Sequence, residues 1–184
     1  QPCHRHACGV VGAVLGASTN CALRRLKINP GGGAEGGSVL EHLHRARKSS
    51  LVTLDVTGIG LGDRGGSKLF ETLIEGKCDF LKSLHLGNNG LTDLAVGRLI
   101  VETLRNESCR IQTLDLNNNQ IGAHVVTQAI KFNKSLTSLD ITGSPIEDEG
   151  LGLIGEILLQ DYCMCSMRYI SCFAFDVKDS EIDL

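Results

Sequence analysis

Two stretches decide the fold: LKSLHLGNNGLTDLAVGRL at residues 81–99 and IQTLDLNNNQIGAHVVTQAI at residues 111–130. Each begins with an apolar residue, two variable residues, an apolar residue, one variable residue and an apolar residue. The alternation in the last three positions is typical of a strand that buries one face. A turn rich in Gly and Asn follows, and then an apolar stretch at helical spacing. Each stretch therefore predicts one strand followed by one helix.

The same unit recurs along the chain. Its strand segments are LRRLKI, LVTLDV, LKSLHL, IQTLDL and LTSLDI, and they begin at residues 23, 51, 81, 111 and 136. A unit of about 30 residues with one strand and one helix cannot bury its apolar face alone, so the copies must stack. We therefore predict an α/β solenoid, a short horseshoe with a parallel β-sheet on its concave face and helices on its convex face.

These units resemble leucine-rich repeats of the ribonuclease-inhibitor-like family, over roughly residues 23–166. The resemblance implies a structural Asn three residues after each LxxLxL segment, where it satisfies backbone groups at the end of the strand. Asn89 and Asn119 occupy that position. The other three repeats have Gly31, Ile59 and Ser144 there. The Asn ladder is therefore incomplete, and the geometry of the first, second and fifth turns stays open.

The flanks of the array are irregular. We interpret residues 1–22 as an N-terminal helix or cap, or as an incomplete repeat. Five repeats follow over residues 23–166, and residues 167–184 form a degenerate repeat or C-terminal cap. The final IDL resembles the beginning of another repeat, so the sequence ends either in a cap or as a truncated piece of a longer chain. No stretch reaches the run of about 18 apolar residues that predicts a membrane span.

Composition and charge restrict the class of function. Aromatic residues make up only 4% of the chain, which indicates a core of aliphatic side chains. A net charge of -3 gives no general reason to expect nucleic-acid binding. The first 50 residues nevertheless carry seven bases against two acids, and the last 49 carry ten acids against two bases, so the molecule can orient a charged partner. The eight cysteines lack the spacing of a disulfide framework. We therefore expect packed, reduced cysteines and an intracellular protein, whether cytoplasmic, ciliary or organellar.

The strand residues that are not committed to the core should point to the concave face. Neighbouring strands lie about 4.8 Å apart, so equivalent residues become lateral neighbours. This places His85 between the carboxylates of Asp55 and Asp115. The residues that we predict to bind a partner are Arg25, Lys27, Asp55, His85, Asp115, Asn117 and Asp140. The alternative is a solvated face on which Asp and Thr merely suit strand ends and turns.

These observations predict a non-enzymatic scaffold for protein–protein interaction, and a subunit of a larger complex. A Lys or Arg of a protein partner would dock against Asp115 and Asp140. We expect no nucleic acid, small-molecule substrate or cofactor.

The resemblance leaves an alternative, because the Ran GTPase activators share this repeat type and supply an arginine from a loop. Arg64 is expected in a loop, but no arginine stands in a recognisable activator motif. Innate-immune-type sensing would require an upstream nucleotide-binding domain, which these 184 residues do not contain.

Other motif-like residues give weaker signals. Cys3, His4, His6 and Cys8 are the candidate metal ligands, but such tight spacing rarely lets four side chains converge on one ion. Glycines at 31, 33 and 36 formally match GxGxxG, yet they belong to the turn of the first repeat. GxSxG, HExxH and P-loop motifs do not occur, so we predict no catalytic residues.

Overall fold

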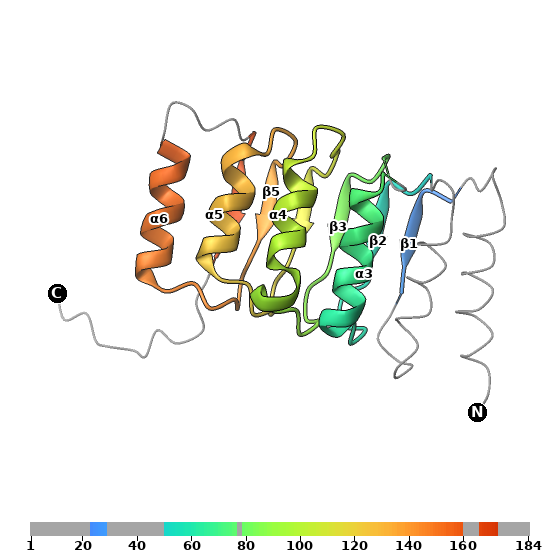
Figure 1. Ribbon diagram of the computed structural model, residues 1–184, viewed down its shortest axis with the longest axis horizontal. Coiled ribbons are helices and arrows are strands. Elements are labelled where there is room, and N and C mark those ends of the chain that lie inside the picture. Colours follow the sequence, from blue (N-terminus) through green and yellow to red (C-terminus); the bar gives the residue numbers. More distant parts are fainter. Residues whose placement is uncertain (1–22, 29–49, 77–78, 160–165, 173–184) are drawn as a thin grey trace.

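The computed structural model describes residues 23–28, 50–76, 79–159 and 166–172. In these residues a single parallel sheet has its strands in chain order: β1 (Arg25–Lys27), β2 (Thr53–Asp55), β3 (Ser83–His85), β4 (Thr113–Asp115), β5 (Ser138–Asp140) and β6 (Tyr169–Ser171). Helices lie side by side in one layer against this sheet: α3 (Gly62–Ile74), α4 (Arg98–Arg105), α5 (Ala123–Phe132) and α6 (Asp148–Leu159) (Figure 1). The predicted α/β solenoid is confirmed.

The register of the sheet follows the repeat. Leu54 of β2 pairs with Leu84 of β3, and Leu84 pairs with Leu114 of β4. Each predicted repeat contributes one strand, and β6 adds another to the edge next to β5. Equivalent positions of successive repeats therefore lie side by side across the whole sheet.

The repeated leucines form a continuous core. The four leucines of the third repeat are at most 1% exposed: Leu81, Leu84, Leu86 and Leu91. Ile100 of α4 belongs to the same core and is also 1% exposed. Burial of each such side chain contributes about 1.5–3 kcal/mol. Strands are about 4.8 Å apart but packed helices about 8–10 Å apart, so the stack curves with the sheet on the inside. The concave face is thus the side of the sheet that is turned away from the helices.

The turns after β2, β3, β4 and β5 share one backbone feature. The second residue after each LxxLxL segment has a positive φ: 68° at Gly58, 55° at Asn88, 50° at Asn118 and 72° at Gly143. This left-handed region is the one that Gly and, next, Asn tolerate best. The second and fifth turns therefore keep this feature although they lack the ladder Asn, while the first turn lies outside the described residues.

Asn119 joins two repeats through its side chain. Its Oδ1 accepts the backbone N–H groups of Asn89 at 3.2 Å and Leu91 at 3.0 Å in the preceding repeat. Its Nδ2 donates to the carbonyl oxygens of Leu86 at 3.0 Å and Leu116 at 2.9 Å. The side chain is only 3% exposed, so water cannot replace these bonds. One amide therefore fixes the turn of its own repeat against its neighbour.

Asn89 makes the same bridge one repeat earlier. It accepts the N–H of Leu61 at 3.1 Å and donates to the carbonyl of Val56 at 2.9 Å. Ser144 stands at the equivalent place in the fifth repeat, is 4% exposed, and its hydroxyl oxygen has no hydrogen-bond partner. The ladder of buried amides thus covers the middle of the array and stops at Ser144.

A second set of inter-repeat bonds lies near the beginnings of the helices, and we did not predict it. The carboxylate of Asp63 accepts the backbone N–H of Thr92 at 2.7 Å and its hydroxyl at 2.9 Å. Asp93 accepts the N–H of Gly122 with both oxygens at 3.0 Å. Asp63 and Asp93 have the same offset from their repeat starts, whereas Ala123 has that offset in the fourth repeat. That recurrence was the signal available in the sequence.

Replacing Asn119 with Ala should destabilise the array. The change leaves buried backbone groups of two repeats unpaired, and each such group costs about 1–3 kcal/mol. We expect the free energy of unfolding to fall by about 3 kcal/mol, measured by urea denaturation. The control is Gln120→Ala at the exposed neighbouring position, which should change it by about 0.5 kcal/mol or less. Equal stability of the two variants would contradict the role of the ladder.

Candidate interaction face

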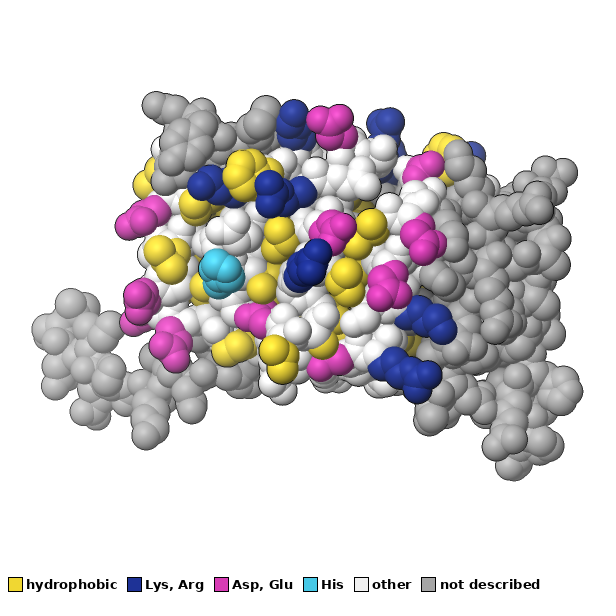
Figure 2. Space-filling model, in the orientation of Figure 1, with side chains coloured by type: hydrophobic (Ala, Val, Ile, Leu, Met, Phe, Trp, Pro, Cys, Tyr) yellow, Lys and Arg dark blue, Asp and Glu magenta, His cyan; other side chains and the backbone are white. Residues whose placement is uncertain are grey.

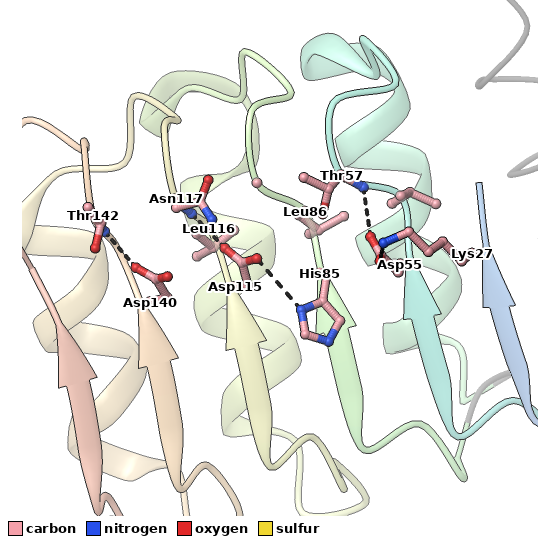
Figure 3. A network of polar contacts seen from close by, with 12 residues as sticks. Lys27, Asp55, Thr57, His85, Leu86, Asp115, Leu116, Asn117, Asp140 and Thr142 are labelled. Carbon is pink, nitrogen blue, oxygen red and sulfur yellow. Dashed lines mark hydrogen bonds and ion pairs between the residues drawn. The ribbon is translucent and has the colours of Figure 1, made fainter. Parts of the chain in front are cut away.

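The concave face carries one row of ionisable side chains. The residue between the second and third apolar positions of each strand segment points out of the sheet, and the strand register aligns these residues laterally. The row crosses β1 to β5 at the carboxyl ends of the strands and consists of Lys27, Asp55, His85, Asp115 and Asp140 (Figure 3). The structure thus brings together five of the residues predicted to bind a partner.

Lys27 and Asp55 form an ion pair at one end of the row. The Nζ of Lys27 lies 2.7 Å from the Oδ2 of Asp55, and their side chains are 67% and 18% exposed. Burial alone would raise the pKa of Asp55. Hydrogen bonds from Lys27 and Thr57, together with the charge of Lys27, outweigh burial and lower this pKa. An exposed pair of this kind stabilises the fold by about 0–1 kcal/mol. The pair therefore sets local charge more than stability.

His85 contacts only one of the two carboxylates that we expected on either side of it. Its Nδ1 lies 3.6 Å from the Oδ2 of Asp115. The carboxylate of Asp55 is directed instead toward Lys27 and the backbone of Thr57 (Figure 3). The expectation of a histidine held between two carboxylates is corrected, because Lys27 draws Asp55 to the other side.

The three aspartates of the row also shape the backbone. One carboxylate oxygen of each accepts the N–H of the residue two positions later: Asp55 from Thr57 at 3.2 Å, Asp115 from Asn117 at 3.0 Å and Asp140 from Thr142 at 2.9 Å. This is the Asx-turn bond that Asp and Asn favour where a strand ends. Within the described residues, Asp140 makes no ion pair. Each Asp thus has a structural role and still presents charge to the concave face.

Two other predicted residues flank the row. Arg25 begins β1, is exposed and pairs in the sheet with Thr53. The side chain of Asn117 lies against Gly87 of the preceding repeat. If residue 87 had a side chain, its Cβ atom would lie only 2.5 Å from the Oδ1 of Asn117. The backbone of Gly87 thus makes room for the amide of Asn117. Asn117 therefore packs on the face, whereas Arg25 projects from its edge.

Metal and cysteine chemistry contribute little to this face. The described residues contain no cluster of three or more His, Cys, Asp or Glu side chains that could hold a metal ion, and Cys3, His4, His6 and Cys8 lie outside them. Cys109 is a free thiol, and burial raises its pKa. At neutral pH it is therefore mainly protonated, as suits a packing residue. Cys172 is also free.

The geometry corrects one element of the GTPase-activator alternative. Arg64, which we expected in a loop, lies exposed in the first turn of α3. Arg24 directly precedes β1, and Arg25 is its first residue. GTPase activation stays an untested prediction.

Comparison with known proteins decides the family. The model of the family "Leucine Rich repeat" matches residues 77–97 and 132–155, which contain β3 and β5. The chain is a leucine-rich-repeat protein. Its repeat length and its unit of one strand and one helix are those of the ribonuclease-inhibitor-like kind.

In the part of the chain that the structure describes, no helix is long and apolar enough to cross a membrane.

Several curated relatives share this repeat region. NACHT, LRR and PYD domains-containing protein 5 of Bos taurus is 27% identical over 177 residues, which cover 78% of this chain and 16% of the relative. NACHT, LRR and PYD domains-containing protein 14 of Mus musculus is 30% identical over 128 residues, or 67% of this chain and 13% of the relative. The leucine-rich-repeat chain therefore spans less than a fifth of the length of these relatives.

Solved structures share the fold at low sequence identity. The tropomodulin C-terminal domain of Caenorhabditis elegans has a TM-score of 0.60 and 9% identity, and the match covers 77% of this chain and 84% of that one. Leiomodin-1 Actin-Binding Site 2 has a TM-score of 0.58 and 16% identity, with 79% and 81% covered. These likenesses support the solenoid architecture.

The Asx-turn bonds predict how the row tolerates mutation. Replacing Asp115 and Asp140 together with Asn removes two charges but keeps an oxygen that accepts the same backbone N–H. The melting temperature should therefore stay within about 4 °C of the unmodified chain, measured by circular dichroism. Replacing both with Ala removes the acceptors and should cost about 0.5–1.5 kcal/mol per site. If the Asn variant melts as low as the Ala variant, the bonds do not have this role.

Proposed function

We propose that this leucine-rich-repeat protein is a non-enzymatic interaction scaffold, a subunit of a larger assembly, that binds a protein partner through its concave face. The observation that carries the proposal is the row of ionisable side chains held in register across β1 to β5 (Figure 3). Repeat proteins present extended concave surfaces of this kind for binding.

The aspartates of the row are held in place by bonds within the chain itself. Its three aspartates are tied to their own backbones, and the buried amides of Asn89 and Asn119 hold successive turns together. Binding therefore has little conformational entropy to remove from these side chains, which favours affinity. This rigidity is what a docking surface needs and what a simple solvated face does not require.

The charges select the chemistry of the partner. Asp115 and Asp140 pair in register across β4 and β5, so one cationic group can contact both. A guanidinium suits this place because it can donate to carboxylates in a bidentate manner. At the other end of the sheet Arg24 and Arg25 are exposed and favour an acidic group. We therefore infer a partner with a Lys or Arg toward β4 and β5 and an acidic residue toward β1.

The fold neighbours support a protein as the partner class. The leiomodin-1 fragment is named as an actin-binding site, so this architecture serves protein binding in that molecule. We propose no cofactor or small-molecule substrate for this chain. The free thiols of Cys109 and Cys172 support an intracellular, reducing compartment as its location.

Charge removal on the concave face tests this function. Tagged chain is incubated with native extract at low salt, and cross-linked partners are quantified by mass spectrometry. For the double variant Asp115→Asn, Asp140→Asn we expect recovery of the specific partner to fall about tenfold, which corresponds to about 1.4 kcal/mol. The matched control is Glu149→Gln, Glu156→Gln, which removes two exposed acids of α6. Unchanged recovery in the first variant would show that the concave face is not the site.

A further inference from the structure

A groove runs along the helical face between α4 and α5. It has a volume of about 960 Å³, and its lining includes Leu94, Val101 and Arg105 from one side and Val125 and Gln128 from the other. Figure 2 shows this face, which is opposite to the concave face. The groove is therefore separate from the row of ionisable side chains described above.

Leu94 forms the apolar end of this groove. It is 99% exposed and lies in a π-helical turn, η2 (Asp93–Gly97), directly before α4. Such turns are rare and occur frequently at functional sites. Asp93 fixes the turn by accepting the N–H of Gly122 with both carboxylate oxygens. Leu94 is thus presented to solvent by a defined turn anchored to the next repeat.

The other end of the groove is basic. Near the carboxyl ends of α4 and α5 it meets a second hollow of about 530 Å³, and Arg105 and Asn106 line both. The ring of Phe132 is 41% exposed there, with the Cζ of Arg105 at 4.6 Å and the Nζ of Lys131 at 5.5 Å from its centroid. Basic side chains gather near these helix ends (Figure 2).

The charge of this end favours an anionic ligand. Lys134 lines the second hollow as well, while Glu107 is the one acid in its lining among the described residues. A carboxylate placed near Phe132 would meet the cations of Arg105, Lys131 and Lys134, which outnumber the nearby acids Glu102 and Glu107. The groove thus has an exposed leucine at one end and a surplus of cations at the other.

We propose that this helical groove is a second docking surface, for an acidic and apolar segment of a partner protein. An apolar side chain of the segment packs on Leu94 and Val101, and its Asp or Glu side chains lie beside Phe132. Leu94 and Arg105 are 11 helical positions apart, or about 16 Å at about 1.5 Å per residue. An extended segment covers this span in about five residues at about 3.3 Å each. The exposed Leu94 favours a peptide over a nucleic acid, whose backbone has no apolar group to cover it.

Selection from a random peptide library tests this inference. A phage-displayed library of 16-residue peptides is selected on the purified chain, and the enriched peptides are synthesised and measured by fluorescence anisotropy. We expect them to share Leu, Ile or Phe with Asp or Glu about five positions away. Failure to enrich acidic and apolar peptides would overturn the proposal, as would enrichment of basic peptides alone.

Variants locate the binding. Leu94→Asp should weaken binding of the selected peptides at least tenfold. The matched change Leu153→Asp, at a 46% exposed leucine of α6, should leave their affinity within twofold.

The double variant Arg105→Glu, Lys134→Glu should weaken binding of these peptides at least tenfold at low salt. A peptide whose acids are replaced by Lys should regain affinity for that variant, which excludes misfolding as the cause.

The concave-face variant separates the two surfaces. Asp115→Asn, Asp140→Asn should bind the selected peptides within twofold of the unmodified chain. If this variant loses the peptides while Leu94→Asp keeps them, the groove is not their site and the second surface is overturned. The concave-face function does not depend on the result with Leu94→Asp, so either proposal can fail alone.

Discussion

The lateral bonds of Asn89 and Asn119 into the preceding repeat are the constraint on which the array depends. A single strand and helix cannot bury their leucines, so each repeat is stable only when its neighbour lies in register. A buried amide that bridges two turns permits only that register, because any displacement leaves backbone N–H groups unpaired. The in-register row of equivalent side chains on the concave face is a direct consequence.

The same alignment gives the polar residues of the strand ends two roles. Asp115 and Asp140 close their own turns with one oxygen and present charge to the concave face. On the helical side, Asp93 anchors the next repeat and thereby holds Leu94 in solvent. Residues that stabilise the stack therefore also position the groups that we propose for recognition.

Much of this structure could be predicted from the sequence, because a repeat of about 30 residues determines which residues of neighbouring strands pair. The strands, the buried leucines and the order of the row follow from the LxxLxL spacing alone. The pairing of Asp55 with Lys27 and not with His85 could not be predicted, because it depends on which rotamer each side chain adopts. The groove at Leu94 was missed for a similar reason, since it arises from two helices that pack only in the folded stack.

Native-state hydrogen exchange, measured by NMR on the unmodified chain, tests the central claim most directly. The amides of Leu61, Asn89 and Leu91 lie in turns but donate to buried Asn side chains. The account predicts that they exchange only in the global unfolding reaction, as slowly as the strand amides of the core. Exchange at the rate of an exposed turn would contradict it, because the repeats would then not be held together through these amides.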